Sequence, residues 1–543
     1  MKNMQSYKIT FWIVIGLLSV LISCSDEDFL EENRKDALTT ENAFLTKSQF
    51  ESLLGSMYRK VQNFYNAGDG DTDAWPLGLG TDAMFFPRDD SSIFNDWSKL
   101  NSFDGYSSRW YTWQYEIINY ANTVIDAAQR EGVEWSSDEE RDEIIAEGRF
   151  FRAFAYRNLT NIFGGVPILD APVIAPKVDF TRNSREECWQ FAKDDLLFAS
   201  NHLPITESRP GKVTRAAADH LLAEVSISLK DWEGAIAAST RVIDGSDGDY
   251  ELMTGRFGSR ANESGKNIYW DLFRMGNQNY DTGNKEAIWV AQMEYNVPGG
   301  TIQFGRPTIE RMMWSAFWDF KKAGYNGQAQ DSTGRGVAFV RPTTYTNYTV
   351  WKGAGSDLRN SEAAIKRKYF FADDVAPYSK GDLIPKSFLT TREDSLQFIY
   401  PNWSKFGTDK HLDGKPDGGY VRDYYVMRLP ETYLLRAEAH LGNNRPDLAA
   451  VDINAIRSRA QAPLVDPADV DIDYILDERI RELFGEEFRM LTLGRLGKIY
   501  DRTKRFGYEP ARNSIKEHNN LFPIPQTVID RNVGAKMEQN PGY

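Results

Sequence analysis

Pairs of short helical stripes, each pair joined by a tight break, recur in this sequence and limit the architectures that it can adopt. Residues 215–229 carry apolar side chains at helical spacing, and a second stripe follows at 232–243 after Lys230 and Asp231. The same arrangement returns at 433–460 around a Gly-Asn-Asn break. Alanines at the contact positions allow close approach of the helices. The pattern is typical of degenerate tetratricopeptide units, which stack to share one core.

Other segments complete this outline. A stripe at 146–163 predicts a helix that a Gly-Gly pair ends. Residues 245–430 are rich in Gly, Asn, Asp, Tyr and Trp, with only two short β-like runs, 288–291 and 336–340. A second irregular stretch covers 66–110. We therefore predict a mainly α protein, a tetratricopeptide-like helical hairpin scaffold with a loop-rich irregular ligand-binding insertion.

Composition excludes several classes of function. The 543 residues hold 64 Lys and Arg against 78 Asp and Glu, a net charge of −14, so the chain lacks the basic field that nucleic-acid binding requires. Aromatic residues make up 13%, which is too much packing material for a disordered chain. Two cysteines build no disulfide framework, and five scattered histidines argue against a His-rich metal site.

The N-terminal residues predict export. Lys2 and Lys8 precede an apolar run at 11–22, which suits a signal peptide and is too short to span a bilayer. Leu21-Ile22-Ser23-Cys24 resembles a lipobox, in which a peptidase cuts before the cysteine and acyl chains are attached to it. We therefore predict a lipoprotein signal peptide at 1–23 and a lipid anchor at Cys24.

The residues after the cysteine indicate where the anchor is placed. Ser25-Asp26-Glu27-Asp28 resembles the acidic signal that carries certain bacterial lipoproteins to the outer face of the outer membrane. Residues 24–40 are predicted to be the acylated cysteine and its tether, and the alternative for the acidic run is that it is only a solvated part of this tether. The expected location is the outer membrane, through the lipid at Cys24, facing the cell exterior. No other run of about 18 apolar residues occurs, so nothing else is expected to span the bilayer.

Six segments of the chain, together with the lipobox, form a recognisable series. They are AEGRFFRAFAYRNLTNIFGGVPIL at 146–169, the hairpin at 216–242, RLPETYLLRAEAHLG at 428–442, INAIRSRA at 453–460, ERIRELFGEEFRMLTLGRLGK at 478–498 and LFPIPQTVIDRNVGAKMEQNPGY at 521–543. In sequence and in order they resemble the SusD/RagB family of outer-membrane nutrient-binding lipoproteins. The resemblance covers nearly the whole chain.

This resemblance implies an all-α core of four tetratricopeptide-like hairpins, an irregular ligand-binding part, no catalysis and no cofactor. It also implies a glycan ligand and a partner, a SusC-like TonB-dependent transporter. Residues 41–543 are then one SusD-like domain. Its helical scaffold is expected at about 41–65, 111–244 and 428–543, and its loop-rich parts at about 66–110 and 245–427.

A sugar ring offers one apolar face and a rim of hydroxyls, so a glycan receptor needs exposed aromatic rings flanked by carboxylate, amide or guanidinium groups. Two stretches supply this combination. The candidates are Asp71, Asp73, Trp75, Arg88, Asn95 and Trp97 in the first stretch, and Tyr295, Arg311, Trp314 and Trp318 in the second. For each tryptophan of the first stretch, a position in the core is the alternative. Trp314 and Trp318 are four residues apart, so they are predicted to share a helical face, with one exposed and the other packed.

Two acidic turns fall short of a cation site. Asp69–Asp73 alternates carboxylates, but Ala74 and Gly80 stand where an EF-hand calcium loop requires Gly and Glu, so a solvated turn is favoured. The run 411–418 offers two aspartates and no third ligand. We therefore predict no metal site.

Four further residues are expected to be structural. Cys188, in a predicted helix at 185–199, is read as a buried thiol, with a nucleophile as the alternative. Glu478, Arg479 and Arg481 are expected to pair across the scaffold.

The predicted function is a cell-surface glycan-binding lipoprotein that captures oligo- or polysaccharide and delivers it to the transporter without catalysis. A peptide-binding receptor of the RagB type is the main alternative. A secreted glycoside hydrolase is another, and it requires two carboxylates roughly 5 to 10 Å apart. An adaptor that grips another protein is a third. No nucleophile elbow, P-loop, zinc motif or dinucleotide fingerprint occurs, so we predict no enzyme.

Overall fold

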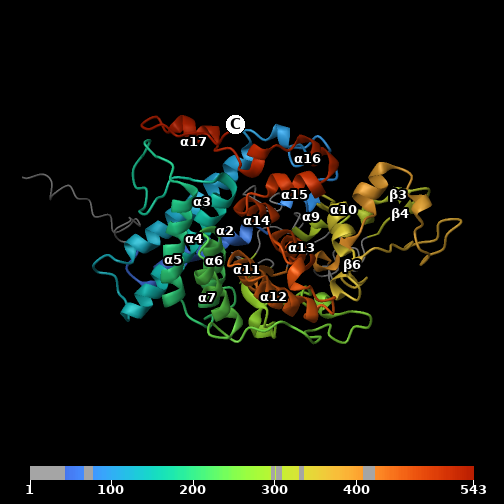
Figure 1. Cartoon of the computed structure of the whole chain (residues 1–543), viewed down its shortest axis with the longest axis horizontal. Helices are drawn as coiled ribbons and strands as arrows, with labels where there is room; N and C mark the ends of the chain where they lie inside the picture. Colours follow the sequence, from blue (N-terminus) through green and yellow to red (C-terminus); the bar gives the residue numbers. More distant parts are fainter. Residues whose placement is uncertain are drawn as a thin grey trace, which may run out of the picture.

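The chain folds into a block of long helices joined to a part built from short, irregular elements, as the computed structural model shows (Figure 1). The structure describes residues 43–65, 78–294, 297, 300, 309–328, 335–407 and 422–543. The long helices are α2 (Lys47–Asn63), α3 (Gly105–Ala127), α4 (Asp138–Phe163), α5 (Arg185–His202), α6 (Arg215–Ser228), α7 (Trp232–Ile243), α11 (Leu429–Gly442), α12 (Pro446–Arg459) and α13 (Ile472–Leu483).

Shorter helices occupy the rest of the chain. They are α8 (Ile268–Asp271), α9 (Ile309–Met313), α10 (Thr344–Asn347), α14 (Arg489–Arg495), α15 (Ile499–Phe506), α16 (Glu509–Ser514) and α17 (Gln526–Arg531). The described ranges thus confirm the prediction of a mainly α protein with a loop-rich insertion.

Local sequence sets where the long helices begin and end. The Ser137 hydroxyl accepts a hydrogen bond of 3.3 Å from the amide of Glu140, which caps α4. The same helix ends at Gly164, whose φ of 77° is left-handed and favours glycine. A capping box between Ser184 and Glu187 starts α5. The predicted helices at 146–163 and 185–199 are both confirmed; α4 begins eight residues earlier than predicted, and α5 ends three residues later.

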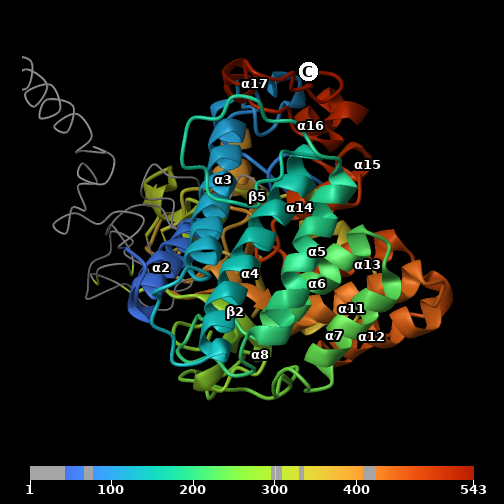
Figure 2. The same ribbon diagram turned by 90° about the vertical axis from the view of Figure 1, so that its left-hand side faces the viewer.

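The predicted hairpins form and stack on one another. Helices α3 to α7 pack in sequence order, and α11 packs on α7 with α12 beside it (Figure 2). Between α7 and α11, Ala235 lies in a buried cluster with Leu435 and Ala439. A Cβ added at Gly442 would come within 2.7 Å of the Trp232 ring, so the small residue permits close approach. Two hairpins far apart in sequence therefore share one core.

Strands are few and short in the described chain. They form four antiparallel pairs, namely β1 (Met84–Phe85) with β5 (Arg341–Pro342), β2 (Ala287–Ala291) with β8 (Tyr424–Arg428), β3 (Lys321–Lys322) with β4 (Tyr325–Asn326), and β6 (Ile365–Lys366) with β7 (Asn402–Trp403). The run predicted at 288–291 is the larger part of β2.

The prediction of a strand at 336–340 is wrong. Its backbone amides bind the end of α9 and the residues after it instead of a neighbouring strand. The Val337 amide donates to the Arg311 carbonyl at 2.7 Å, and the Val340 amide donates to the Met312 carbonyl at 2.9 Å. The last carbonyls of a helix have no partner within the helix, so they accept these bonds.

The irregular stretch predicted at 66–110 is shorter than expected at its C-terminal end. Helix α3 begins at Gly105, because the Asp104 carboxylate accepts from the amide of Ser107 at 2.7 Å. Trp110 therefore lies on this helix and is buried.

A buried ionic cluster joins the helical block to the irregular part. Arg428 of β8 binds Glu286 beside β2 at 2.6 Å and Glu482 of α13 at 2.9 Å. Arg459 of α12 binds both of these carboxylates. Each charge is surrounded by partners of opposite sign, so removal of any one leaves a buried charge uncompensated.

The same cluster continues along α13. Glu478 binds Arg359 of the irregular part at 2.8 Å and Arg481 at 2.7 Å. Although burial alone would raise it, these guanidinium groups lower the pKa of Glu478 to about 2. Arg479 binds Glu487 at 2.8 Å. The prediction that these residues pair across the scaffold is confirmed.

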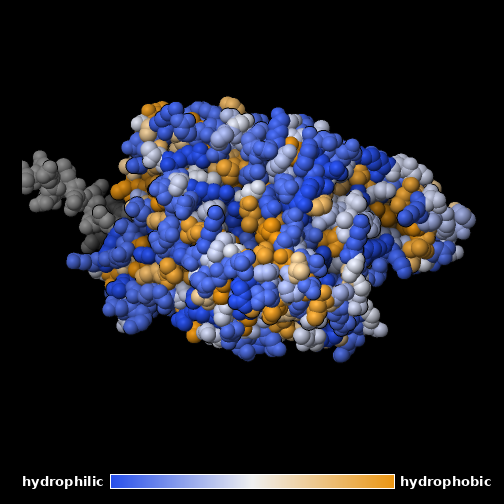
Figure 3. All heavy atoms as spheres, viewed as in Figure 1, coloured by the Kyte–Doolittle hydropathy of each residue, from blue (hydrophilic) through white to orange (hydrophobic). Residues whose placement is uncertain are grey.

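The surface in view mixes hydrophilic and hydrophobic side chains without one continuous apolar face (Figure 3). Hydrophobic groups appear at several separate places on this face. Phe370 and Leu383, which pair with each other in an isolated β-bridge, are both exposed. Among the helices that the structure describes, none is long and apolar enough to cross a membrane.

Candidate functional site

Three residues of the first predicted ligand cluster lie in the described ranges, and one of them is exposed while two are buried. Arg88 is exposed. Trp97 is only 6% exposed, and its indole nitrogen donates to the Gly80 carbonyl at 2.9 Å. Asn95 is fully buried, and its amide bonds the backbone of Phe86 in both directions. Trp97 and Asn95 therefore hold the loop in place, and their burial argues against the predicted ligand contact.

The second cluster also divides. Trp314 is 3% exposed and donates from its indole nitrogen to the Trp403 carbonyl at 3.0 Å, whereas Trp318 is half-buried. One ring is thus packed and the other reaches the surface, but not through a shared helical face. Helix α9 ends at Met313, and Trp318 lies in a separate 3-10 turn, Phe317–Asp319. The burial of Trp314 argues against its predicted contact with a ligand.

Residues of both clusters meet on one short segment, 335–339. Arg88 donates from Nε to the Val337 carbonyl at 2.7 Å. Arg311 donates from Nε to the Arg335 carbonyl at 3.1 Å. Trp318 donates from its indole nitrogen to the Gly336 carbonyl at 2.7 Å. We call the surface formed by Arg88, Arg311, Trp318, Arg335 and Phe339 the 335–339 surface.

Aromatic rings and guanidinium groups alternate on this surface. The Arg335 guanidinium lies 4.4 Å from the centre of the Trp318 ring, and that of Arg88 lies 5.1 Å from the centre of the Phe339 ring. Phe86 meets Phe339 edge to face, with 5.7 Å between ring centres. Flat half-exposed rings beside fixed hydrogen-bond donors are the combination that a sugar requires.

Burial affects the charge of Arg88. Desolvation lowers the pKa of this side chain, while the nearby Tyr400 and Asp319 oppose the change. An acceptor group from a ligand would favour the charged guanidinium in the same way.

Four predicted ligand residues lie outside the described ranges: Asp71, Asp73, Trp75 and Tyr295. The acidic turns at 69–73 and 411–418 lie outside them as well. The described residues on either side of these segments contact one another. The Gln62 side chain donates to the Gln292 carbonyl at 2.6 Å, the Tyr65 ring stacks on Tyr424, and the Met293 amide donates to Asp423 at 2.7 Å.

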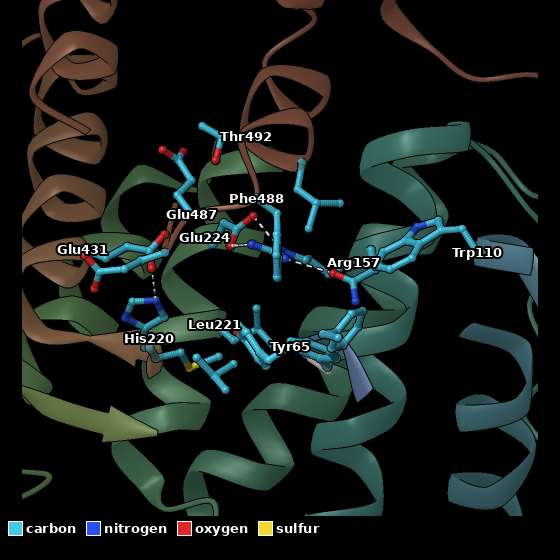
Figure 4. Close-up of a pocket in the computed structure, with 17 residues that line it drawn as sticks. Tyr65, Trp110, Arg157, His220, Leu221, Glu224, Glu431, Glu487, Phe488 and Thr492 are labelled. Atoms are coloured by element: carbon cyan, nitrogen blue, oxygen red, sulfur yellow. Dashed lines mark hydrogen bonds and ion pairs between the residues drawn. The ribbon is translucent and has the colours of Figure 1, made fainter. Parts of the chain in front are cut away.

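A small polar cavity lies just inside these contacts (Figure 4). Its volume of about 40 Å³ suits a few water molecules and not a sugar. Arg157 of α4 binds Glu224 of α6 at 2.5 Å, and His220 lies 3.5 Å from Glu431 of α11. Burial would raise the pKa of Glu431, but Arg479 and His220 hold it below the ordinary range. The cavity is therefore lined by ion pairs that join neighbouring helices.

Sequence reasoning missed this cavity. Arg157 and Glu224 stand within the helices predicted at 146–163 and 215–229, and Glu431 lies just before the one predicted from 433. Glu224 is buried, and the other two are half-buried. A charged residue on a buried helix face was the available signal, and it indicates a partner on the facing helix.

The described ranges contain no group of three His, Cys, Asp or Glu side chains placed to bind a metal ion. Cys188 is fully buried, and its thiol lies 3.4 Å from the Val166 carbonyl. Burial raises the pKa of this thiol, which disfavours the nucleophilic thiolate. The prediction of a buried structural thiol is confirmed.

The fold defines a class of protein in which stacked helical hairpins carry irregular segments, and here these segments form the 335–339 surface. Two family models match the chain, one described as the SusD family at residues 397–543 and one described as starch-binding associating with outer membrane at 28–227. The chain belongs to the SusD-like family. The resemblance read from the sequence is thereby confirmed.

The similarity to curated relatives extends over most or all of their length. A SusD-like protein of Formosa agariphila is 24% identical and covers 99% of this chain and 100% of its own. A SusD-like protein of Bacteroides ovatus is 23% identical over 92% of this chain and 83% of its own.

Solved structures confirm the fold. A laminarin-binding SusD-like protein has a TM-score of 0.67 at 21% identity, covering 92% of this chain and 100% of its own. Surface glycan-binding protein A of Bacteroides thetaiotaomicron, in complex with laminarihexaose, has a TM-score of 0.66 at 17% identity and covers 91% and 99%.

Proposed function

We propose that this protein captures an oligo- or polysaccharide at the outer surface of the cell and delivers it, without catalysis, to a SusC-like TonB-dependent transporter. The observation that carries the proposal is the similarity, over almost the whole chain, to a laminarin-binding SusD-like protein and to a glycan-binding protein solved with laminarihexaose. A role at the outer membrane is supported by the description of the family model that matches residues 28–227.

The 335–339 surface supports a saccharide as ligand. Trp318 is half-exposed, and its indole nitrogen already has a partner in the Gly336 carbonyl, so the ring is held in one orientation. Arg335 and Arg88 present donors beside the rings. In this arrangement an apolar sugar face would lie on a ring while its hydroxyls accept from the guanidinium groups.

Attachment to the membrane is proposed through acyl chains on Cys24. The eighteen residues between Cys24 and the first described residue, at 43, reach at most about 65 Å when fully extended. A tether of this kind would keep the folded part close to a transporter in the same membrane.

The test is calorimetric titration of the acylated protein, held in detergent, with laminarin and with plant, host and microbial polysaccharides. A set of unstructured peptides is the comparison. We expect heat with at least one glycan and no release of reducing ends during prolonged incubation. Heat with peptides only would support the peptide receptor, and new reducing ends would contradict a non-catalytic role.

Delivery to the transporter is tested separately. Co-purification of the acylated protein with a SusC-like barrel encoded by the same organism is the expected result. A protein that binds glycan but never associates with such a barrel would refute the delivery step alone.

A further inference from the structure

An open groove lies beside the loop between α3 and α4. Its volume is about 410 Å³, against about 40 Å³ for the cavity of Figure 4. This size falls within the range of small-ligand sites. Its walls come from the end of α3, the following loop, α4 and α5, and include Arg130, Trp135, Arg141, Asp142, Arg149 and Phe198. We call it the Trp135 groove; it shares no residue with the 335–339 surface.

Trp135 is a ring held in a fixed position at the wall of the groove. Its indole nitrogen donates to the Ala128 carbonyl at 3.2 Å, and its ring packs on Phe50 with 4.9 Å between ring centres. The ring remains half-exposed. These contacts orient an aromatic surface toward the groove without the entropic cost of ordering it on binding.

Hydrogen-bond donors outnumber acceptors in the groove. Three guanidinium side chains line it, those of Arg130, Arg141 and Arg149, and each is between 31% and 37% exposed. The lining contains one carboxylate, Asp142. Its Oδ1 accepts from Arg141, and its Oδ2 lies 3.9 Å from His202. The groove therefore favours a ligand that presents acceptor groups.

Arg149 is the least compensated of the three cations. Both oxygens of Asp195 accept from Arg152, at 2.7 and 2.8 Å, so Arg149 is only the second partner of that carboxylate, at 3.7 Å. The Arg149 Nε is buried and has no hydrogen-bond partner within the described ranges. Desolvation lowers the pKa of Arg149 further than Asp195 restores it. An anion in the groove would stabilise this charge.

Phe198 sets the position of Arg149. The Arg149 guanidinium lies 4.3 Å from the centre of the Phe198 ring, and the His202 ring stacks on the same ring with 4.0 Å between centres. Arg130 and Arg141 are tied to the helix surface by Asp126 at 2.6 Å and Asp138 at 2.8 Å. The three guanidinium groups are thus held in place, and the planar arrangement of their N–H donors matches the oxygens of carboxylate and sulfate groups.

We propose that the Trp135 groove is a second saccharide site, selective for sugars that carry a carboxylate or a sulfate group. The sugar ring lies on Trp135, the anionic group pairs with Arg149, and the free oxygen of Asp142 accepts from a hydroxyl. This proposal goes beyond the function proposed above, and it stands even if neutral glycans do not bind.

The experiment compares acidic and neutral oligosaccharides of one length on the acylated protein in detergent. Calorimetric titrations use hexagalacturonate, a sulfated chondroitin hexasaccharide and laminarihexaose. We expect at least one acidic probe to bind, and Arg149→Gln and Trp135→Ala each to weaken that binding at least tenfold. Trp135→Phe should retain most of it. Arg445→Gln, which removes an exposed arginine elsewhere on the surface, should leave it unchanged.

Two controls separate the outcomes. Trp318→Ala, on the 335–339 surface, should not alter binding of the acidic probe. Melting curves show whether each groove variant is folded, and Arg141→Gln replaces Arg149→Gln if the latter does not fold. The proposal is overturned if neither acidic probe binds the natural protein at millimolar concentration. It is also overturned if the acidic probe binds folded Trp135→Ala and folded Arg149→Gln, or its replacement, as tightly as it binds the natural protein.

Discussion

Trp314 and Trp318 stand four residues apart, yet they have different environments. Trp314 is enclosed and bonded to the Trp403 carbonyl, whereas Trp318 reaches the surface beside Arg335. We expect Trp318→Ala to weaken glycan binding by about 1 to 3 kcal/mol, the range for stacking on an aromatic ring, with an unchanged melting temperature. Trp314→Ala should instead lower the free energy of unfolding by about 3 to 5 kcal/mol. Calorimetric titration and thermal melting of both variants make the comparison.

Either of two results would contradict this assignment. Unchanged glycan affinity in a folded Trp318→Ala variant would remove the ring from the ligand surface. A Trp314→Ala variant as stable as the natural protein would contradict its burial.

Asp82 is a second residue whose role the structure defines. It is fully buried and binds Arg489 at 2.7 Å and Arg502 at 2.8 Å. Burial alone would raise the pKa of Asp82, but the two guanidinium groups lower it from 3.8 to about 2. Since the pKa in the folded state is the lower one, this carboxylate stabilises the protein above pH 4 and loses that effect as the pH falls toward 2.

The predicted consequence is a pH-dependent cost of Asp82→Asn. At pH 7 the variant removes a buried carboxylate from both arginines, leaving Arg489 with Glu487 at 3.5 Å and Arg502 with Asp477 at 2.6 Å, and it should lose about 3 kcal/mol of stability. By pH 3 the difference between the natural protein and the variant should shrink by about 1 kcal/mol. Urea unfolding at pH 7, 4 and 3 measures it, with the exposed Asp530→Asn as control. A difference that stays constant over this range would refute the assigned pKa.

Residue identity alone decided little about exposure. Trp97 and Trp318 are equivalent candidates by composition, yet Trp97 is buried and Trp318 is half-exposed, although the indole nitrogen of each donates to a glycine carbonyl 17 or 18 residues away. By contrast, the pairing of Glu478 with arginines was predictable, because a charged residue on the apolar face of a helix requires a partner.

At the scale of elements, the space around a helical glycine shows how closely a neighbouring helix approaches. Gly494 in α14 lies against α4, and an added Cβ would stand 2.2 Å from the Asn161 carbonyl oxygen. Gly55 in α2 has no atom within 4 Å of such a Cβ. We expect Gly494→Ala to destabilise the protein by about 1 to 3 kcal/mol, because backbone must move. Gly55→Ala should stabilise it by about 0.5 to 1 kcal/mol.

Urea unfolding of both glycine variants tests the expectation, and each variant serves as the control of the other. Equal effects of the two substitutions would contradict the close contact of α14 with α4.

Long helices were predictable where a stripe of apolar side chains ran for several turns, as in α4 and α6. The strand expected at 336–340 shows the limit of such patterns. A run of alternating side chains specifies an extended backbone but not its partner, and here the partners are carbonyls of 311–314. Only the folded chain brings that helix end close.

At the scale of the whole molecule, the anchor remains a prediction from sequence. Cys24→Ala should leave a folded protein with an unchanged melting temperature that no longer sediments with membranes, because no acyl chain can be attached. Fractionation of cells that lack the partner transporter, with immunodetection, is the measurement. Finding the variant in the membrane fraction would refute the lipobox.

The contact between α6 and α11 can form only after the ribosome has made both helices. His220 bonds Thr432 at 2.8 Å across 212 residues of chain, and the buried cluster of Ile227 and Ala235 is completed only by Leu435 and Ala439. At roughly 5 to 20 residues per second, the ribosome makes α11 about 10 to 40 s after α6. For that interval Ile227 and Ala235 lack the cover that α11 gives them in the folded protein, so we expect this patch of the first hairpin to stay exposed on the nascent chain.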